Sequence, residues 1–290
     1  MVRFLPTIVS SPDEVIKEVL ARVAEARIRF PLVERMIPGV HLECYPAPGA
    51  LGCHNPRNAR PPDWSFIDSL GGLADLICLI TVAPELDGAI IFILNGVRAG
   101  KKMAIGHTLA SSLEISAAYD AGACLSTHLG NGAPAELPRH GKGNPLWRQF
   151  AISNLHASLI ADFQHIDSET LRDFVTIKGI HRSIIVTDSI FAAGLGEGEY
   201  EFSGQKIVVK RGRAYLKNRP EVLAGSVTSM LECLDNLLKI GLQTNQALHM
   251  MSAGPALLMN WNLEGSSLTV ERNGEGAKVK SLLMDGERMI

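Results

Sequence analysis

The sequence of 290 residues is poor in three features, and each shortage excludes a class of protein. Its five cysteines are odd in number and widely spaced, which excludes a disulfide framework and is typical of a reducing compartment. No apolar run reaches the ~18 residues of a membrane span, and the N-terminus lacks the apolar segment of a signal peptide. We therefore expect a cytoplasmic protein that does not enter a membrane.

Charge is also scarce and nearly balanced. Charged residues make up 20% of the chain, and the formal net charge is −2. This composition gives no basic surface for nucleic acid, whereas the 46% of apolar residues can bury a large core. The composition predicts a compact, soluble protein.

Short apolar runs alternate with stretches of helical period along most of the chain. One expected helix begins at a capping box of Ser11 and Glu14 and carries an apolar stripe of Val15, Val19, Leu20 and Val23. Two more expected helices cover residues 111–121 and 168–178. The expected strands are residues 4–9, 39–43, 76–82, 102–106, 124–127, 158–161 and 183–187, with an eighth near 222–224. Apolar strands alternating with helices are typical of a parallel sheet covered by helices, and the count predicts an α/β fold of the (β/α)8 TIM-barrel type.

Two regions interrupt this alternation. Residues 199–216 have the pattern of β-hairpins, with turns at Ser203-Gly204 and Arg211-Gly212. Residues 268–290 read as short strands around Asn273-Gly274 and Asp285-Gly286. We therefore expect a barrel over residues 1–265 and a small β segment over residues 266–290.

Acidic residues and histidines stand at the ends of five expected strands. They are Glu43, His107, His128, Asp162 and Asp188. Because the C-terminal ends of barrel strands meet at one face, we expect these side chains to converge. Two histidines and one carboxylate form a known ligand set for catalytic zinc, which activates water and polarises a carbonyl. A carboxylate such as Asp188 could then move the proton in amide hydrolysis.

Each of these residues also has a purely structural explanation. A histidine at a strand end is more often a surface residue than a ligand, and Asp188 would suit the N-cap of a following helix. A structural zinc site of His41, Cys44, Cys53 and His54 is disfavoured, because its Cys-x8-Cys spacing is wider than that of structural sites. The argument for a catalytic site therefore depends on the whole set.

A series of short motifs extends this set in a fixed order from Phe4 to Pro255. They are residues 41–43, 52–56 with 60–63, 82–85, 106–108, 127–131, 160–165, 186–188 with 192–195, and 223–226. In this order, they resemble the motifs of the N-acetylglucosamine-6-phosphate deacetylases of the amidohydrolase superfamily. The resemblance implies an amidohydrolase barrel, a homodimer, and one divalent metal ion, usually zinc, with iron, cobalt or manganese as the alternatives.

The resemblance also implies roles for single residues. Glu43, His107 and His128 match the metal ligands, and Asp188 matches the catalytic acid and base. His165 matches the histidine that contacts the sugar and steadies the scissile carbonyl. The other implied substrate contacts are Cys53, His54, Asn131, Gly132, Arg139, Asp162, Leu223, Ala224 and Gly225, with Arg139 at the phosphate.

Several positions depart from the family pattern and keep three functions open. Cys44-Tyr45 replaces Gly-Pro, Phe163 replaces a glycine, and the chain begins about one barrel strand late, so we expect a barrel without its first strand. The first function is conversion of N-acetylglucosamine 6-phosphate to glucosamine 6-phosphate and acetate. The second is hydrolysis of another N-acyl or cyclic amide, and the third is that of a non-catalytic homologue.

Overall fold

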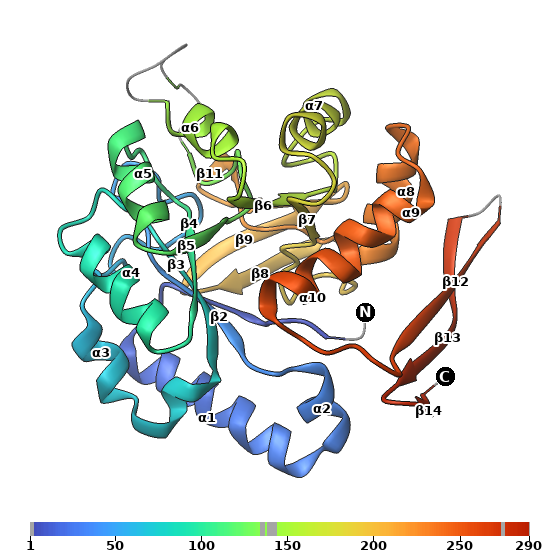
Figure 1. Cartoon of the computed structure of the whole chain (residues 1–290), viewed down its shortest axis with the longest axis horizontal. Coiled ribbons are helices and arrows are strands. Elements are labelled where there is room, and N and C mark those ends of the chain that lie inside the picture. The colour runs from blue at the N-terminus through green and yellow to red at the C-terminus, as the bar shows by residue number, and fades with distance from the viewer. Residues whose placement is uncertain (1–2, 134–136, 138–143, 274–275, 290) are drawn as a thin grey trace. The chain divides into compact units, whose positions relative to one another are not determined.

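The computed structural model describes residues 3–133, 137, 144–273 and 276–289 (Figure 1). These residues fall into two compact units. The N-terminal unit covers residues 3–155 and 201–205, and the C-terminal unit covers residues 156–200 and those from 206 onward. Within the described residues, no helix has both the length and the apolar character needed to cross a membrane.

Five parallel strands form the sheet of the N-terminal unit. They are β1 (Thr7–Val9), β2 (Val40–Tyr45), β3 (Ile77–Val82), β4 (Lys102–Ile105) and β5 (Ala123–Ser126). The helices of this unit are α1 (Asp13–Arg29), α2 (Pro31–Met36), α3 (Trp64–Ser69), the 3-10 helix η1 (Gly71–Leu76), α4 (Ala89–Arg98), α5 (Ser112–Asp120) and α6 (Pro145–Ala151). In Figure 1, α1, α3, α4 and α5 lie along one side of the sheet. All six residues of β2 are buried, which explains why these strands read as continuous apolar runs.

The C-terminal unit combines a parallel strand pair with helices and antiparallel strands. β6 (His156–Ile160) and β7 (Ser183–Val186) are parallel. The helices are α7 (Ser168–Lys178), α8 (Met230–Lys239), α9 (Thr244–Leu248), the π-helical turn η2 (His249–Ala253) and α10 (Gly254–Met259). The antiparallel strands are β8 (Gly198–Phe202), β9 (Gln205–Lys210), β10 (Arg213–Leu216) and β11 (Arg219–Leu223), then β12 (Ser267–Asn273), β13 (Gly276–Met284) and β14 (Glu287–Arg288).

The strand order confirms the predicted class of fold in its coarser form. Parallel strands β1 to β7 follow one another in chain order, with helices between most of them, as in a partial TIM-barrel-like α/β fold. The predicted eighth strand is wrong. Residues 219–223 form β11, which pairs antiparallel with β10 because the chain turns back at residues 217 and 218. Beyond β7, the parallel pairing in the described residues consists of an isolated bridge between Ser189 and Ser226.

The first helix differs from the prediction in its cap and in its buried face. Pro12 is the N-cap, and no side chain caps the helix. Glu14 is then the second helical residue, so the expected capping box with Ser11 cannot form. Ile16 and Leu20 are the buried residues, whereas Val15 and Val19 are 43% and 37% exposed. Of the predicted stripe, Leu20 is buried and Val23 packs against the core, as expected, whereas Ile16 takes the buried position predicted for Val15 and Val19.

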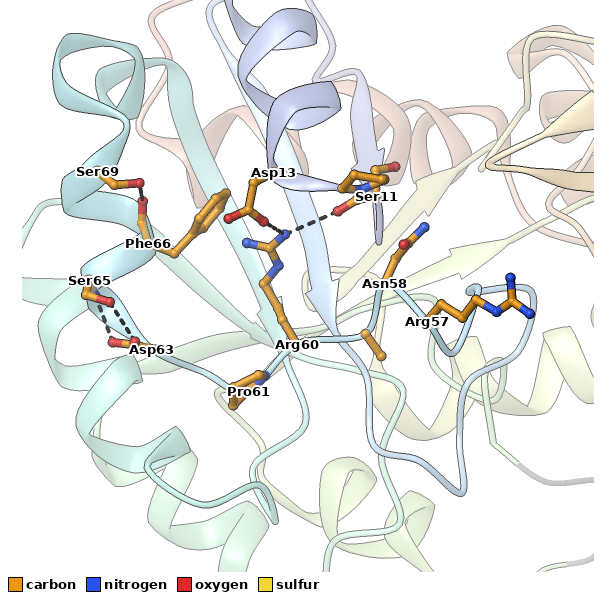
Figure 2. Close-up of a pocket in the computed structure, with 12 residues that line it drawn as sticks. Ser11, Asp13, Arg57, Asn58, Arg60, Pro61, Asp63, Ser65, Phe66 and Ser69 are labelled. Atoms are coloured by element: carbon orange, nitrogen blue, oxygen red, sulfur yellow. Dashed lines mark hydrogen bonds and ion pairs between the residues drawn. The ribbon is translucent and has the colours of Figure 1, made fainter.

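A polar pocket of about 480 Å³ lies beside the start of α1 (Figure 2). Arg60 crosses it, and its Nη2 donates hydrogen bonds to Asp13 Oδ1 (2.6 Å) and to the carbonyl oxygen of Ser11 (3.2 Å). The guanidinium carbon lies 3.8 Å from the ring centroid of Phe66, which is a cation–π contact. None of the strand-end residues lines this pocket. We interpret Arg60 as a tie between α1 and the loop that precedes α3.

Candidate metal centre and active site

Three strand ends of the N-terminal unit bring Glu43, His107 and His128 into one buried cluster. Their exposed fractions are 4%, 6% and 5%. Glu43 Oε1 lies 3.1 Å from His128 Nε2 and 3.5 Å from His107 Nε2. The structure therefore brings together three side chains that are 64 and 21 residues apart in the sequence.

The two distances from Glu43 Oε1 to the histidine nitrogens fit ligands of a single metal ion. Ligand atoms that each lie about 2.1 Å from a tetrahedral ion are about 3.4 Å apart. Glu43 Oε1 is buried and makes no hydrogen bond within the described part of the chain. Burial alone would raise the pKa of Glu43, but the charges of His128 and His107 outweigh it and hold the pKa well below its ordinary value. The result is an ionised carboxylate oxygen beside two imidazole nitrogens, which is a donor set suited to a divalent cation.

Backbone strain marks the same residues. His107, His128 and Asp188 have φ values of 50°, 30° and 49°, in the left-handed region that residues other than glycine rarely adopt. Such conformations cost about 1–2 kcal/mol each and persist where the surrounding structure enforces them, which is often at active sites. At His107, the enforcing contact is a hydrogen bond from Ala47 N to the His107 carbonyl oxygen (2.9 Å).

The ring of His107 is oriented by its neighbours. Its Nδ1 lies 2.8 Å from the carbonyl oxygen of Ala50. A carbonyl can only accept, so the Nδ1 carries a proton, and the Nε2 is the ring nitrogen that faces Glu43. Gly132 packs against the ring, because a Cβ at this position would lie 2.6 Å from the Nδ1, and its φ of +71° also requires glycine. We therefore infer that Gly132 makes room for the His107 ring.

A third histidine borders the cluster. His54 is 2% exposed, and its ring centroid lies 4.4 Å from that of His107. Burial, followed by the nearby charge of His107, lowers the pKa of His54 to about 3. Possible ligand atoms of Glu43, His54 and His107 lie within 4.8 Å of one another. Two sets of three residues thus share Glu43 and His107, with either His128 or His54 as the third member.

A layer of polar side chains supports the cluster, and the sequence analysis missed it. His41 Nε2 lies 2.7 Å from Thr81 Oγ1, which lies 2.6 Å from Thr127 Oγ1. These contacts pass Gly106, the residue directly after β4, where a Cβ would lie 2.6 Å from the Thr81 side chain and 3.0 Å from that of Thr127. The layer holds the backbone next to His128 and two residues before Glu43.

Glu85 anchors the loop that follows His107. Its Oε2 accepts a hydrogen bond from Thr108 Oγ1, and its Oε1 accepts one from Leu109 N, each at 2.5 Å. Position 85 lies in one of the motifs of the sequence, which was the available signal for this role. The carboxylate fixes the loop directly after a strained residue of the cluster.

Asn131 and Cys53 make backbone contacts in this unit. Asn131 Nδ2 donates to the carbonyl oxygen of His128 (3.1 Å), and the carbonyl oxygen of Cys53 accepts from Gln205 Nε2 (2.6 Å). Arg139, the expected phosphate ligand, lies outside the described residues.

In the C-terminal unit, Asp162 orients His165. Asp162 Oδ1 accepts hydrogen bonds from Gln164 N and His165 N, each at 2.9 Å, and Asp162 Oδ2 lies 2.7 Å from His165 Nδ1. Burial would raise the pKa of Asp162, but the hydrogen bond and the charge of His165 lower it overall. An ionised carboxylate only accepts, so His165 Nδ1 carries a proton and its Nε2 points away from Asp162. Phe163, between them, has a strained φ of 59°.

The segment of Leu223 to Gly225 is built against Asp188. Ser226 N donates to the carbonyl oxygen of Asp188 (2.8 Å). A Cβ at Gly225 would lie 2.8 Å from that oxygen and 3.8 Å from Asp188 Oδ2. No helix begins after Asp188, since the next element is β8, so the N-cap explanation is wrong. Asp188 is a strained strand-end carboxylate without a capping role.

Comparisons with known proteins agree with the residue pattern. No model of a known protein family matches the chain. The N-acetylglucosamine-6-phosphate deacetylase of Haemophilus influenzae is 30% identical over 259 residues, covering 87% of this chain and 65% of that protein. The protein of the same name from Bacillus subtilis is 32% identical over 237 residues, covering 79% and 58%. This chain therefore spans less than two thirds of either relative's length.

A solved structure shows the same fold. It is a variant N-acetyl-D-glucosamine-6-phosphate deacetylase from Mycobacterium smegmatis, in complex with N-acetyl-D-glucosamine-6-phosphate. The TM-score is 0.88 at 24% sequence identity, and the alignment covers 100% of this chain and 77% of that one. At this identity, the likeness establishes the fold alone.

Proposed function

We propose, from the premise that this chain is a homologue of the N-acetylglucosamine-6-phosphate deacetylases, that it is an amidohydrolase acting on N-acetylglucosamine 6-phosphate. The products are glucosamine 6-phosphate and acetate. The observation that carries the proposal is the buried convergence of Glu43 with His107 and His128. We further propose that the sheet belongs to a (β/α)8-type barrel without its first strand, in a cytoplasmic homodimer.

Glu43, His107 and His128 would hold one divalent ion, with zinc as the first choice and iron, cobalt or manganese as the alternatives. When bound, such an ion lowers the pKa of water toward ~7 and polarises an amide carbonyl. The protein contributes a fixed donor geometry. Ala50 orients His107, and the two neighbouring histidines keep Glu43 ionised against the effect of its burial.

Asp188 is the proposed proton carrier. As a carboxylate it accepts a proton from the attacking water, and as a carboxylic acid it donates that proton to the departing amine. One C–O bond forms at the acetyl carbon, the C–N bond breaks, and the proton passes from water oxygen to amine nitrogen. The motif position and the strained strand-end backbone of Asp188 support this role.

The remaining expected site residues would bind the sugar phosphate. His165, held by Asp162, would contact the sugar and the scissile carbonyl. Arg139 would bind the phosphate through its guanidinium group, which matches phosphate geometry. The other proposed contacts are Cys53, His54, Asn131, Gly132, Asp162, Leu223, Ala224 and Gly225.

An acetate-release assay with matched substrates tests this function. We expect metal-replete protein to hydrolyse N-acetylglucosamine 6-phosphate with a kcat/KM about 10- to 150-fold above that for N-acetylglucosamine, because hydrogen bonds to a charged phosphate contribute about 1.5–3 kcal/mol. Arg139→Ala should remove this preference and leave the unphosphorylated sugar unaffected. Equal rates on both sugars would favour hydrolysis of another N-acyl or cyclic amide. Metal-replete protein that hydrolyses no amide would favour a non-catalytic homologue.

A further inference from the structure

His54 is held by the residue that follows β1. Ser10 is fully buried, and both its backbone N (3.3 Å) and its Oγ (2.9 Å) approach the Nδ1 of His54. A backbone N–H group can only donate, so His54 Nδ1 is the acceptor. A neutral imidazole that accepts at Nδ1 carries its proton on Nε2.

His54 and His107 are therefore fixed in opposite tautomers, although their ring centroids are only 4.4 Å apart. The carbonyl of Ala50 holds a proton of His107 on Nδ1, so Nε2 is the ring nitrogen that can present a lone pair to a metal ion. The N–H of Ser10 puts the proton of His54 on Nε2. A protonated nitrogen cannot bind a metal ion, so His107 suits a ligand and His54 suits a hydrogen-bond donor.

The turn between β8 and β9 forms hydrogen bonds with the main chain of Ser10 and of Cys53, on either side of His54. Ser203 Oγ donates to the carbonyl oxygen of Ser10 (3.0 Å), and Gln205 Nε2 donates to the carbonyl oxygen of Cys53 (2.6 Å). Ser203 and Gly204 have φ values of 49° and 72°, as in the tight turns of two-residue hairpins. Residues 203–205 belong to the N-terminal unit, and they bind the main chain of the residue before His54 and of the residue that fixes its ring.

We propose that Ser10 and the β8–β9 turn (residues 203–205) are positioning elements that hold His54 as an Nε2–H donor beside the metal centre and outside its ligand set. The inference rests on the proposed function, because a donor here would bind an acceptor oxygen of the sugar phosphate. The proposal gives the turn of residues 203–205 a positioning role. It also excludes His54 as the third metal ligand beside Glu43 and His107, and this third ligand is then His128.

Two substitutions of His54 test the donor directly. The side-chain NH₂ of glutamine stands close to the position of Nε2, whereas that of asparagine stands close to Nδ1. We expect His54→Gln and His54→Asn both to bind one equivalent of zinc. His54→Gln should keep KM within a few-fold of the original, and His54→Asn should raise it about tenfold, the effect of one lost hydrogen bond. Loss of zinc from both variants, or equal KM values, would overturn the proposal.

The positioning role has its own variants. Ser203→Gly removes the hydroxyl and keeps a residue that favours positive φ, and Gln205→Leu removes the amide donor. We expect the double variant to raise KM several-fold, with kcat and zinc content unchanged. Lys206→Ala, at the exposed neighbouring position, is the control and should change neither. An unchanged KM in the double variant would contradict the role of the turn.

Nitrogen-15 NMR of the histidine rings separates this inference from the proposed function. We expect His54 to show the Nε2–H tautomer and His107 the Nδ1–H tautomer in metal-free protein. This result needs no turnover, so an inactive protein with these tautomers would disprove the deacetylase function alone. A proton on Nδ1 of His54 would overturn the inference, whatever the activity.

Discussion

Asp188→Asn should lower kcat about 10³-fold while one equivalent of metal stays bound. Asparagine has nearly the same shape, but it can neither take a proton from water nor give one to the amine, and general acid–base catalysis contributes about 10²–10⁴-fold. The measurement is acetate release from N-acetylglucosamine 6-phosphate, paired with metal analysis of the same sample.

The exposed Asp173 on α7 provides a matched control, because Asp173→Asn makes the same chemical change away from any strand end. It should leave kcat unchanged. Normal turnover in Asp188→Asn would remove Asp188 from the mechanism. Loss of metal in that variant would show that Asp188 is a metal ligand and not a proton carrier.

His107→Ala should abolish metal binding and, with it, activity. Losing a residue that only orients a ligand typically weakens metal binding 10- to 100-fold, so the loss of one of three protein ligands should cost more than that. We expect the dialysed variant to retain no stoichiometric zinc and to release acetate at the background rate. Added zinc should not restore the rate.

His181→Ala is the corresponding control. His181 lies in the C-terminal unit, and its Nδ1 lies 3.2 Å from His249 Nε2, so it shares residue type but no contact with Glu43. This variant should keep its zinc and its turnover. Full metal content in His107→Ala would show that the ion is held elsewhere.

The fold was predictable where burial acts on single strands. β2 is buried along its whole length, so it reads as an apolar run, and the helix predicted at residues 168–178 forms as α7 with Asp167 as its cap. The prediction was wrong where neighbouring residues compete. The N-cap of α1 is Pro12 and not the predicted Ser11. Residues 219–223 pair with β10 as an antiparallel strand and do not extend the parallel sheet.

The residues of the candidate site could be predicted from their positions near strand ends, but the contacts that hold them could not. His107 and His128 follow strands and Glu43 lies near the end of one, and this position is visible in the sequence. The contacts of Ser10 with His54 and of Thr81 with Thr127 depend on the register of strands and on loops that pack across them. Gly106 is the clearest example, because its lack of a side chain leaves room for the side chains of Thr81 and Thr127, which come from distant parts of the sequence. The spacing of residues along the chain does not predict a contact of this kind.

Anomalous diffraction from crystals of the zinc-loaded protein tests the central claim most directly. The account predicts one zinc peak at about 2.0–2.2 Å from Glu43 Oε1 and from the Nε2 atoms of His107 and His128, with His54 outside bonding distance. A peak coordinated by other side chains, or an empty map between these three residues in protein that binds zinc stoichiometrically, would contradict it.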